Sequence, residues 1–171
     1  IPTIQMIFYR TDDSFAIYSK SSMAETAWDL NSVGYMRKEP DARAPRRIDA
    51  KAIKENLTEE ISPEACYDKI AVIGLQFGPT FRGIERIWRR DGEALAIVRM
   101  ARLLGSEDKD YFFHPAFLDA CFQVLFSAIP RNNGETSKSP YLPVRIGRVR
   151  NHARPTPQVW SHALLSNVSA G

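Results

Sequence analysis

The segment that most limits the fold of this chain is an almost entirely apolar stretch, residues 114–129, with the sequence HPAFLDACFQVLFSAI. It opens with a His-Pro pair, and proline is favoured at the first position of a helix. After this start, its polar side chains are Asp119, Gln123 and Ser127. A helix with so few polar positions has no side suited to water. We therefore expect a buried core helix.

Strand patterns precede and follow this predicted helix. Apolar and polar residues alternate around Asp91-Gly92, a pair typical of a tight hairpin turn. A shorter helix is expected after Ser62, which can cap it, and Gly74 marks its end. The other expected strands lie within residues 1–37, at about 142–151 and at about 157–166. The pattern predicts a mixed α+β fold.

Residues 39–60 are expected to be a linker. The stretch 37–50 contains two prolines and five Lys or Arg residues among few apolar ones, which is typical of a solvated connection. The chain before it opens with Ile1-Pro2-Thr3 inside a strand pattern, and three strands alone do not close a core. We expect the chain to be a piece of a longer protein.

Composition excludes several classes of protein. Of the 171 residues 44% are hydrophobic and 25% charged, unlike a disordered chain or a coiled coil. The net charge, 23 − 20 = +3, is too small for a dedicated nucleic-acid binder. There is no apolar run of membrane-spanning length. Cys66 and Cys121 lack metal-ligand spacing, so we expect free thiols and no metal. Nucleotide-binding and serine-nucleophile motifs are absent.

Asp119 and Gln123 are four residues apart, so they share one face of the predicted helix. A carboxyl group among apolar side chains is costly unless it is paired or protonated. One interpretation is a general acid that Gln123 orients, since such surroundings favour a carboxyl group that holds its proton near neutral pH. The other is a structural aspartate bonded to backbone donors or to a tyrosine hydroxyl.

Other polar residues favour structural interpretations. His114 is expected to cap the central helix, while His152 and His162 are expected on the surface or within a sheet. Arg145, Arg148 and Arg150 alternate with apolar residues, which indicates a half-exposed strand, although they could also attract an acidic partner.

Three motifs resemble the dehydratase domains of polyketide synthases. They are LQFGPTFRG at 75–83, HPAFLDACFQ at 114–123 and YLPV at 141–144, in the order seen in that family. The resemblance implies a double hotdog, in which each half is a long helix wrapped by an antiparallel sheet. By this resemblance, residues 1–38 are the closing strands of the first hotdog, and 61–171 are the second.

The resemblance implies removal of water from a β-hydroxyacyl thioester carried on the phosphopantetheine arm of an acyl carrier protein. Asp119 would protonate the departing hydroxyl with help from Gln123, and a histidine of the first half would take the α-proton. The implied substrate-binding residues are Phe77, Gly78, Pro79, Phe81, His114, Leu142 and Pro143. No directly bound cofactor is implied. The implied partners are the carrier protein, neighbouring synthase domains and a second copy in the parent, in the cytoplasm, without nucleic acid or membrane.

The sequence departs from the family pattern at several positions. The family's His-x-x-x-Gly-x-x-x-x-Pro motif is absent, so we expect the isolated chain to lack the base. Phe77 stands where tyrosine is usual, which removes a phenol from the site. A non-catalytic scaffold that binds acyl chains, and an enoyl isomerase or cyclase on the same fold, remain alternatives. An upstream histidine motif would favour the enzyme over the scaffold.

Overall fold

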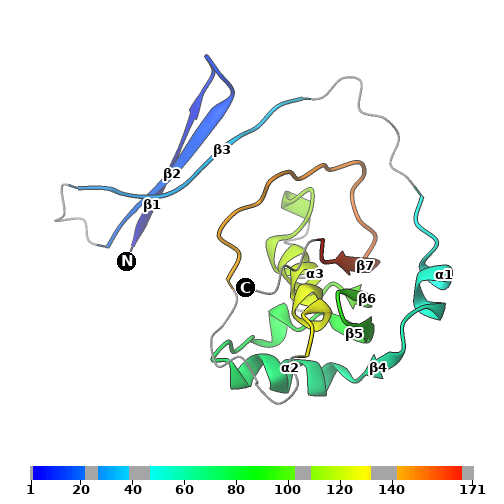
Figure 1. Ribbon diagram of the computed structural model, residues 1–171. Helices are drawn as coiled ribbons and strands as arrows, with labels where there is room; N and C mark the ends of the chain where they lie inside the picture. Colours follow the sequence, from blue (N-terminus) through cyan, green and yellow to red (C-terminus); the bar gives the residue numbers. More distant parts are fainter. Residues whose placement is uncertain (1, 22–26, 39–46, 103–108, 132–141, 167–171) are drawn as a thin grey trace. The chain divides into compact units, whose positions relative to one another are not determined.

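The computed structural model describes residues 2–21, 27–38, 47–102, 109–131 and 142–166. The chain divides into two compact units, 1–44 and 45–171 (Figure 1). Among the described residues, no helix has the length and apolar character needed to cross a membrane.

The first unit is a three-stranded antiparallel sheet in the order β1-β2-β3. Its strands are Thr3–Tyr9, Ser14–Lys20 and Asp29–Tyr35, as the alternating pattern predicts. The β1–β2 turn depends on Asp12 and Asp13. The Asp12 carboxylate accepts a hydrogen bond from the Ser14 N–H at 3.1 Å, and Asp13 takes a left-handed φ of 59°, which short polar side chains tolerate.

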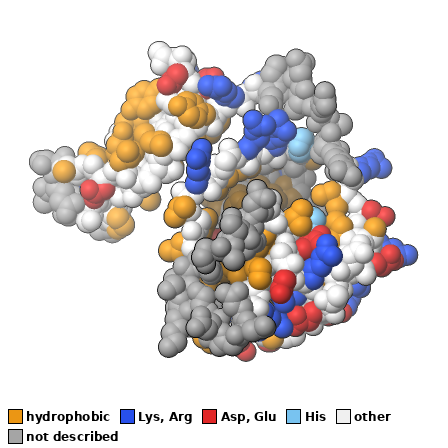
Figure 2. Space-filling view, in the orientation of Figure 1, with side chains coloured by type: hydrophobic (Ala, Val, Ile, Leu, Met, Phe, Trp, Pro, Cys, Tyr) orange, Lys and Arg blue, Asp and Glu red, His pale blue; other side chains and the backbone are white. Residues whose placement is uncertain are grey.

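This sheet has little interior of its own. Within the described part of the unit, Ala16 is the one fully buried residue. Apolar side chains gather on its surface (Figure 2), among them Ile4 (72% exposed), Leu30 and Val33. A three-stranded sheet without a helix cannot cover such side chains by itself.

The second unit is built on a four-stranded antiparallel sheet in the order β4-β5-β6-β7. Gly92 forms the β5–β6 turn with a φ of +85°, a conformation that suits glycine. The strands are β4 Glu59–Ile61, β5 Ile84–Arg90, β6 Glu93–Arg99 and β7 Gln158–Leu164. The helices are α1 Ala50–Glu55, α2 Pro63–Val72, the 3₁₀ turn η1 Pro79–Phe81 and α3 Pro115–Ala128.

The predicted central helix is α3, and it packs against β5, β6 and β7 (Figure 1). Its buried face carries Phe117, Ala120 and Val124, each no more than 2% exposed. They join one apolar core with Ile87 of β5, Val98 of β6 and residues of α2. The predicted burial of α3 is incomplete in the second unit, because Phe122 and Leu125 are 40% and 42% exposed.

Part of the expected linker is ordered structure. Within 39–60 the structure contains α1 and most of β4. Asp49 caps α1 by accepting hydrogen bonds from the Lys51 and Ala52 N–H groups, and the Lys54 ammonium lies 4.4 Å from the Trp88 ring centroid on β5. Pairing with β5 makes residues 59–61 a strand. Composition alone could not reveal these partners, because they are distant in sequence.

The expected strand at 142–151 is not formed. Each of these residues is exposed and without regular secondary structure. Val144 is 97% exposed, so the alternation of apolar residues and arginines there does not separate a buried side from a wet one. Strand pairing needs a neighbouring edge, and among the described strands none pairs with this segment.

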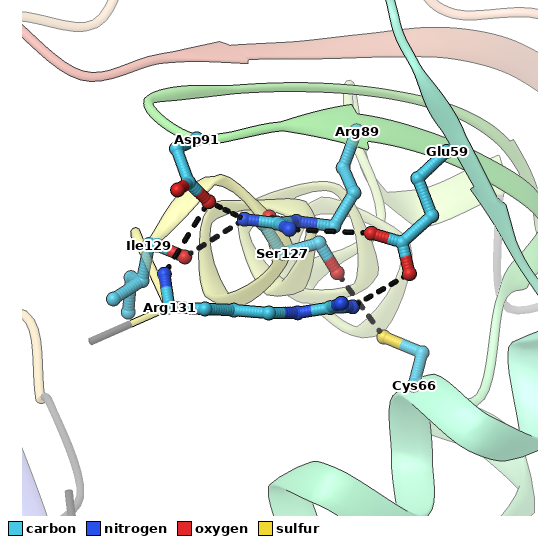
Figure 3. A network of polar contacts seen from close by, with 7 residues as sticks. All are labelled: Glu59, Cys66, Arg89, Asp91, Ser127, Ile129 and Arg131. Carbon is cyan, nitrogen blue, oxygen red and sulfur yellow. Dashed lines mark hydrogen bonds and ion pairs between the residues drawn. The ribbon is translucent and has the colours of Figure 1, made fainter. Parts of the chain in front are cut away.

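The C-terminal end of α3 is held by Arg89 of β5 (Figure 3). The Arg89 side chain is 6% exposed. Its guanidinium donates to the carbonyl oxygens of Ser127 at 2.6 Å and Ile129 at 3.1 Å. It also forms ion pairs with Glu59 and Asp91. These bonds satisfy carbonyls that the helix itself leaves unpaired, and they place a cation at its negative end.

Replacing Arg89 with Met should destabilise the second unit. Arg89→Met leaves buried carbonyls without donors, so we expect a loss of about 2–4 kcal/mol in the free energy of unfolding, measured by urea titration with tryptophan fluorescence. The matched control is Arg99→Met. Arg99 pairs with Glu85 while its side chain is 46% exposed, so we expect a clearly smaller loss than for Arg89→Met. Equal losses in the two variants would contradict the role of Arg89.

A second polar cluster joins the ends of β6 and β7. Glu93, whose side chain is 10% exposed, accepts hydrogen bonds from Arg90 at 2.8 Å and interacts with His162 Nε2 at 2.8 Å. Burial by itself would raise the pKa of Glu93, but the hydrogen bonds from His162 and Arg90 outweigh it and lower the pKa below its usual 4.5.

Stability should therefore fall in acid. A carboxylate whose pKa is lower in the folded state stabilises the fold above its unfolded pKa, and this contribution is lost as the pH falls through the folded pKa. We expect the urea midpoint to drop between about pH 5 and pH 3. Glu93→Gln should reduce that drop, whereas a profile identical to the parent's would show that Glu93 does not contribute.

Candidate functional site

The candidate site lies on α3, where the chain enters the helix at His114. His114 is the N-cap residue, and its Nδ1 accepts a hydrogen bond from the Ala116 N–H at 3.2 Å. The side chain is buried and contacts the Tyr111 ring edge-on, with 4.9 Å between the ring centroids. The capping role predicted from the His-Pro pair is confirmed.

Asp119 and Gln123 meet as their spacing predicts. Gln123 is 2% exposed, and Asp119, one turn earlier, is half-buried. The Gln123 amide Nε2 donates to Asp119 Oδ2 at 2.8 Å and to the main-chain oxygen of Phe81 at 3.1 Å. Through Gln123, the carboxyl group is thus anchored to a turn far away in sequence. Among the described residues, no hydrogen bond joins it to a tyrosine.

The segment 75–83 forms the turn beside α3. Phe77 packs against the core and meets the Tyr67 ring edge-on at 6.4 Å, and its carbonyl accepts a hydrogen bond from Arg82 Nε at 3.0 Å. Gly78 and Pro79 are exposed, and Phe81 is 40% exposed. The main-chain oxygen of Phe81 is thus linked to Asp119 through the Gln123 amide.

Gly83 is a member of this site that sequence reasoning missed. It is buried where the turn crosses β6 and α3. A Cβ atom on it would lie 2.8 Å from the Arg99 carbonyl oxygen and 2.9 Å from the Ala120 Cβ. Only glycine allows so close an approach. Its position at the end of the 75–83 motif could have identified Gly83 as part of the site.

Leu142 and Pro143 are not brought to this face. Both are exposed, Leu142 by 62%. In the described ranges, no hydrogen bond or ring contact joins either residue to α3. Their expected role in substrate binding is therefore not supported by any contact here.

The other reactive side chains lie elsewhere. His162 is on β7 beside Glu93, and His152 is exposed. Both cysteines are free thiols. Burial raises the pKa of Cys121 to about 11, so little thiolate forms near neutral pH. In the part of the chain that the structure describes, no group of His, Cys, Asp or Glu side chains could hold a metal ion.

This arrangement can do one kind of chemistry on its own. A carboxyl group on the edge of an apolar helix, held by a buried amide, can deliver a proton to a ligand at its open side. Within the described residues, no hydrogen bond joins Asp119 to a histidine. In the part of the chain that the structure describes, this carboxyl group therefore has an amide partner and no histidine partner.

Comparison with known proteins gives consistent matches. A family model described as "Polyketide synthase dehydratase N-terminal domain" matches residues 45–171. Polyketide synthase GfsE of Streptomyces halstedii is 30% identical over 132 residues, which is 73% of this chain and 3% of GfsE. The chain therefore spans a small fraction of the curated relatives that it matches.

Solved structures match along almost the whole chain. The dehydratase domain from the CurF module of the curacin polyketide synthase is 28% identical, with a TM-score of 0.84, over 98% of this chain and 59% of that one. The domain from the CurK module is 27% identical, with a TM-score of 0.85, over 99% of this chain and 60% of that one. The CurK dehydratase has also been solved as two inactive mutants, one His→Phe and one Asp→Asn.

These matches confirm the α+β hotdog fold expected from the three motifs, as part of a double hotdog. The family model covers well over half of the chain. This chain belongs to the polyketide synthase dehydratase family.

Proposed function

We propose that this chain carries the general acid of a dehydratase domain. The domain would remove water from a β-hydroxyacyl thioester, held on the phosphopantetheine arm of an acyl carrier protein, to give an α,β-enoyl thioester. The observation that carries the proposal is the half-buried Asp119 carboxyl group, bonded to Gln123 at 2.8 Å on an otherwise apolar helix.

The chemistry explains why an acid is needed. Hydroxide is a poor leaving group, so the β-hydroxyl must gain a proton as its C–O bond breaks. The α-proton must leave as well, because its C–H electron pair forms the new C=C bond. An acid and a base on opposite sides of the thioester divide this cost. Asp119 would be the acid.

The base would be a histidine outside this sequence. The CurK dehydratase supports a two-residue mechanism, because its His→Phe and Asp→Asn mutants are both described as inactive. We assign residues 1–38 to the closing strands of the first hotdog, 39–60 to a connection that includes α1, and 61–171 to the second hotdog. The description of the matched family model names an N-terminal domain. The sequence preceding Ile1 would show whether residues 61–171 are the second hotdog, as assigned here, or belong to an N-terminal one.

The same proposal accounts for the surroundings of Asp119. The substrate tunnel would be shaped by Phe77, Gly78, Pro79 and Phe81, together with His114 at the start of α3. Leu142 and Pro143 would join them once the first hotdog is in place. The partners would be the carrier protein, neighbouring synthase domains and a second copy of the parent protein, in the cytoplasm. The dehydratase would need no directly bound cofactor.

The role of Asp119 can be tested by replacing its carboxyl group with an amide, which cannot act as a general acid. In the dehydratase that contains this chain, Asp119→Asn should lower kcat by about 10²–10⁴-fold, the usual contribution of general acid catalysis. The matched control is Asp68→Asn on the exposed face of α2, which should keep the parent's kcat. Near-normal turnover by Asp119→Asn, in a folded protein, would return Asp119 to the structural interpretation.

The isolated 171-residue chain should not dehydrate its substrate, because it holds the acid without the base. The measurement is mass-spectrometric detection of enoyl product from a β-hydroxyacyl pantetheine thioester, with the full dehydratase domain as positive control. Any enoyl product above the rate without protein would contradict the assignment of the base to another segment.

A further inference from the structure

The orientation of the Gln123 amide follows from its contact with the main chain of Phe81. A main-chain carbonyl oxygen can only accept hydrogen bonds, so the amide group that faces it must be the NH₂ group. The same nitrogen faces Asp119 Oδ2, and the two contacts, 3.1 Å and 2.8 Å, use both amide hydrogens. The reversed amide would place its oxygen against two acceptors.

The amide oxygen supports this orientation. Gln123 Oε1 is buried and has no hydrogen-bond partner among the described residues. A buried acceptor without a donor is costly. Gln123 Oε1 stays unpaired while both N–H groups of the amide are used. This indicates that the contacts with Phe81 and Asp119 determine the orientation of the amide.

We infer that the Phe81 carbonyl, acting through Gln123, makes Asp119 Oδ1 the oxygen that carries and delivers the acid proton. This rests on the proposed function of Asp119. The N–H group of Gln123 points at Oδ2, so Oδ2 acts as the acceptor oxygen of the carboxyl group. The proton of the protonated acid is left to Oδ1.

The proton transfer balances with this assignment. The Oδ1–H bond breaks, and its proton goes to the departing β-hydroxyl oxygen while the C–O bond breaks, so water leaves. The base takes the α-proton, and the C–H electron pair becomes the C=C bond. Asp119 is left as a carboxylate that still accepts the Gln123 hydrogen bond, and this bond helps to stabilise the new charge.

Gly83 is the positioning residue that keeps Phe81 at this distance. Its carbonyl accepts a hydrogen bond from the Arg99 N–H at 2.7 Å, which ties the turn to β6. On its other side, a Cβ atom at position 83 would lie 2.9 Å from the Cβ atom of Ala120, the residue after Asp119. A methyl group at Gly83 would push the turn away from α3, and this would lengthen the bond between Phe81 and Gln123.

The test uses the dehydratase that contains this chain and a β-hydroxyacyl pantetheine thioester. Gly83→Ala should lower kcat by about 10- to 100-fold, since small displacements at a reacting group have effects of this size. KM should stay within about threefold, because the lost interaction acts mainly in the transition state. Adding Ala120→Gly removes one of the two clashes and should restore part of the lost kcat. Gly147→Ala is the matched control, because its Cβ would meet nothing within 4 Å.

A second variant keeps the proposal testable if Gly83→Ala does not fold. Gln123→Met has a similar volume but no donor, and we expect the same loss of kcat with KM nearly unchanged. Circular dichroism and Tm identify the folded variants. Folded Gly83→Ala with kcat within about twofold of the parent would overturn the inference, and if it does not fold, the same result for Gln123→Met would do so.

Asp119→Asn separates this inference from the proposed function. If Asp119→Asn is inactive while the folded Gly83 or Gln123 variant turns over normally, only the positioning role fails. If Asp119→Asn turns over normally, the proposed function itself fails.

Discussion

The second unit depends on the way in which Arg89 holds the C-terminal end of α3. The final carbonyls of a helix have no partner within it, and Ser127, Ala128 and the C-cap residue Ile129 provide no basic side chain and no glycine to cap them. The β5–β6 hairpin supplies the donors. Arg89 binds the carbonyls of Ser127 and Ile129, and the Gly92 N–H donates to that of Ala128 at 2.8 Å. The sheet and the helix are therefore joined by polar bonds as well as by the apolar core.

A second constraint acts nearer the other end of α3, where the site lies. Gly83 lets the turn at Pro79–Phe81 touch the helix beside Ala120, and the Phe81 carbonyl then receives the Gln123 amide. With α3 held to the hairpin at one end and to this turn near the middle, Asp119 has a defined place on the unit. In the proposed function, that place decides where a proton is delivered.

Local patterns predicted the elements that depend on neighbours in sequence. The His-Pro pair predicted the cap of α3, Asp91-Gly92 predicted the hairpin, and the four-residue spacing predicted the contact between Asp119 and Gln123. Local patterns failed where a distant partner decides. Residues 50–60 belong to the stretch predicted as linker, but Lys54 and Glu59 contact Trp88 and Arg89. Residues 142–151 alternate like a strand but pair with none of the described strands. No local pattern indicates the role of Arg89, because its carbonyl partners are about forty residues away.

The sequence by itself determined that a nearly apolar helix lies at the centre of the second unit and that Asp119 and Gln123 share one of its faces. Both follow from helix geometry and from the cost of leaving apolar side chains in water. Only the tertiary structure decided what the Gln123 amide binds, which side of α3 stays open, and which groups close the helix end. These depend on hydrogen bonds and close contacts between residues far apart in the chain, and no local pattern encodes such partners.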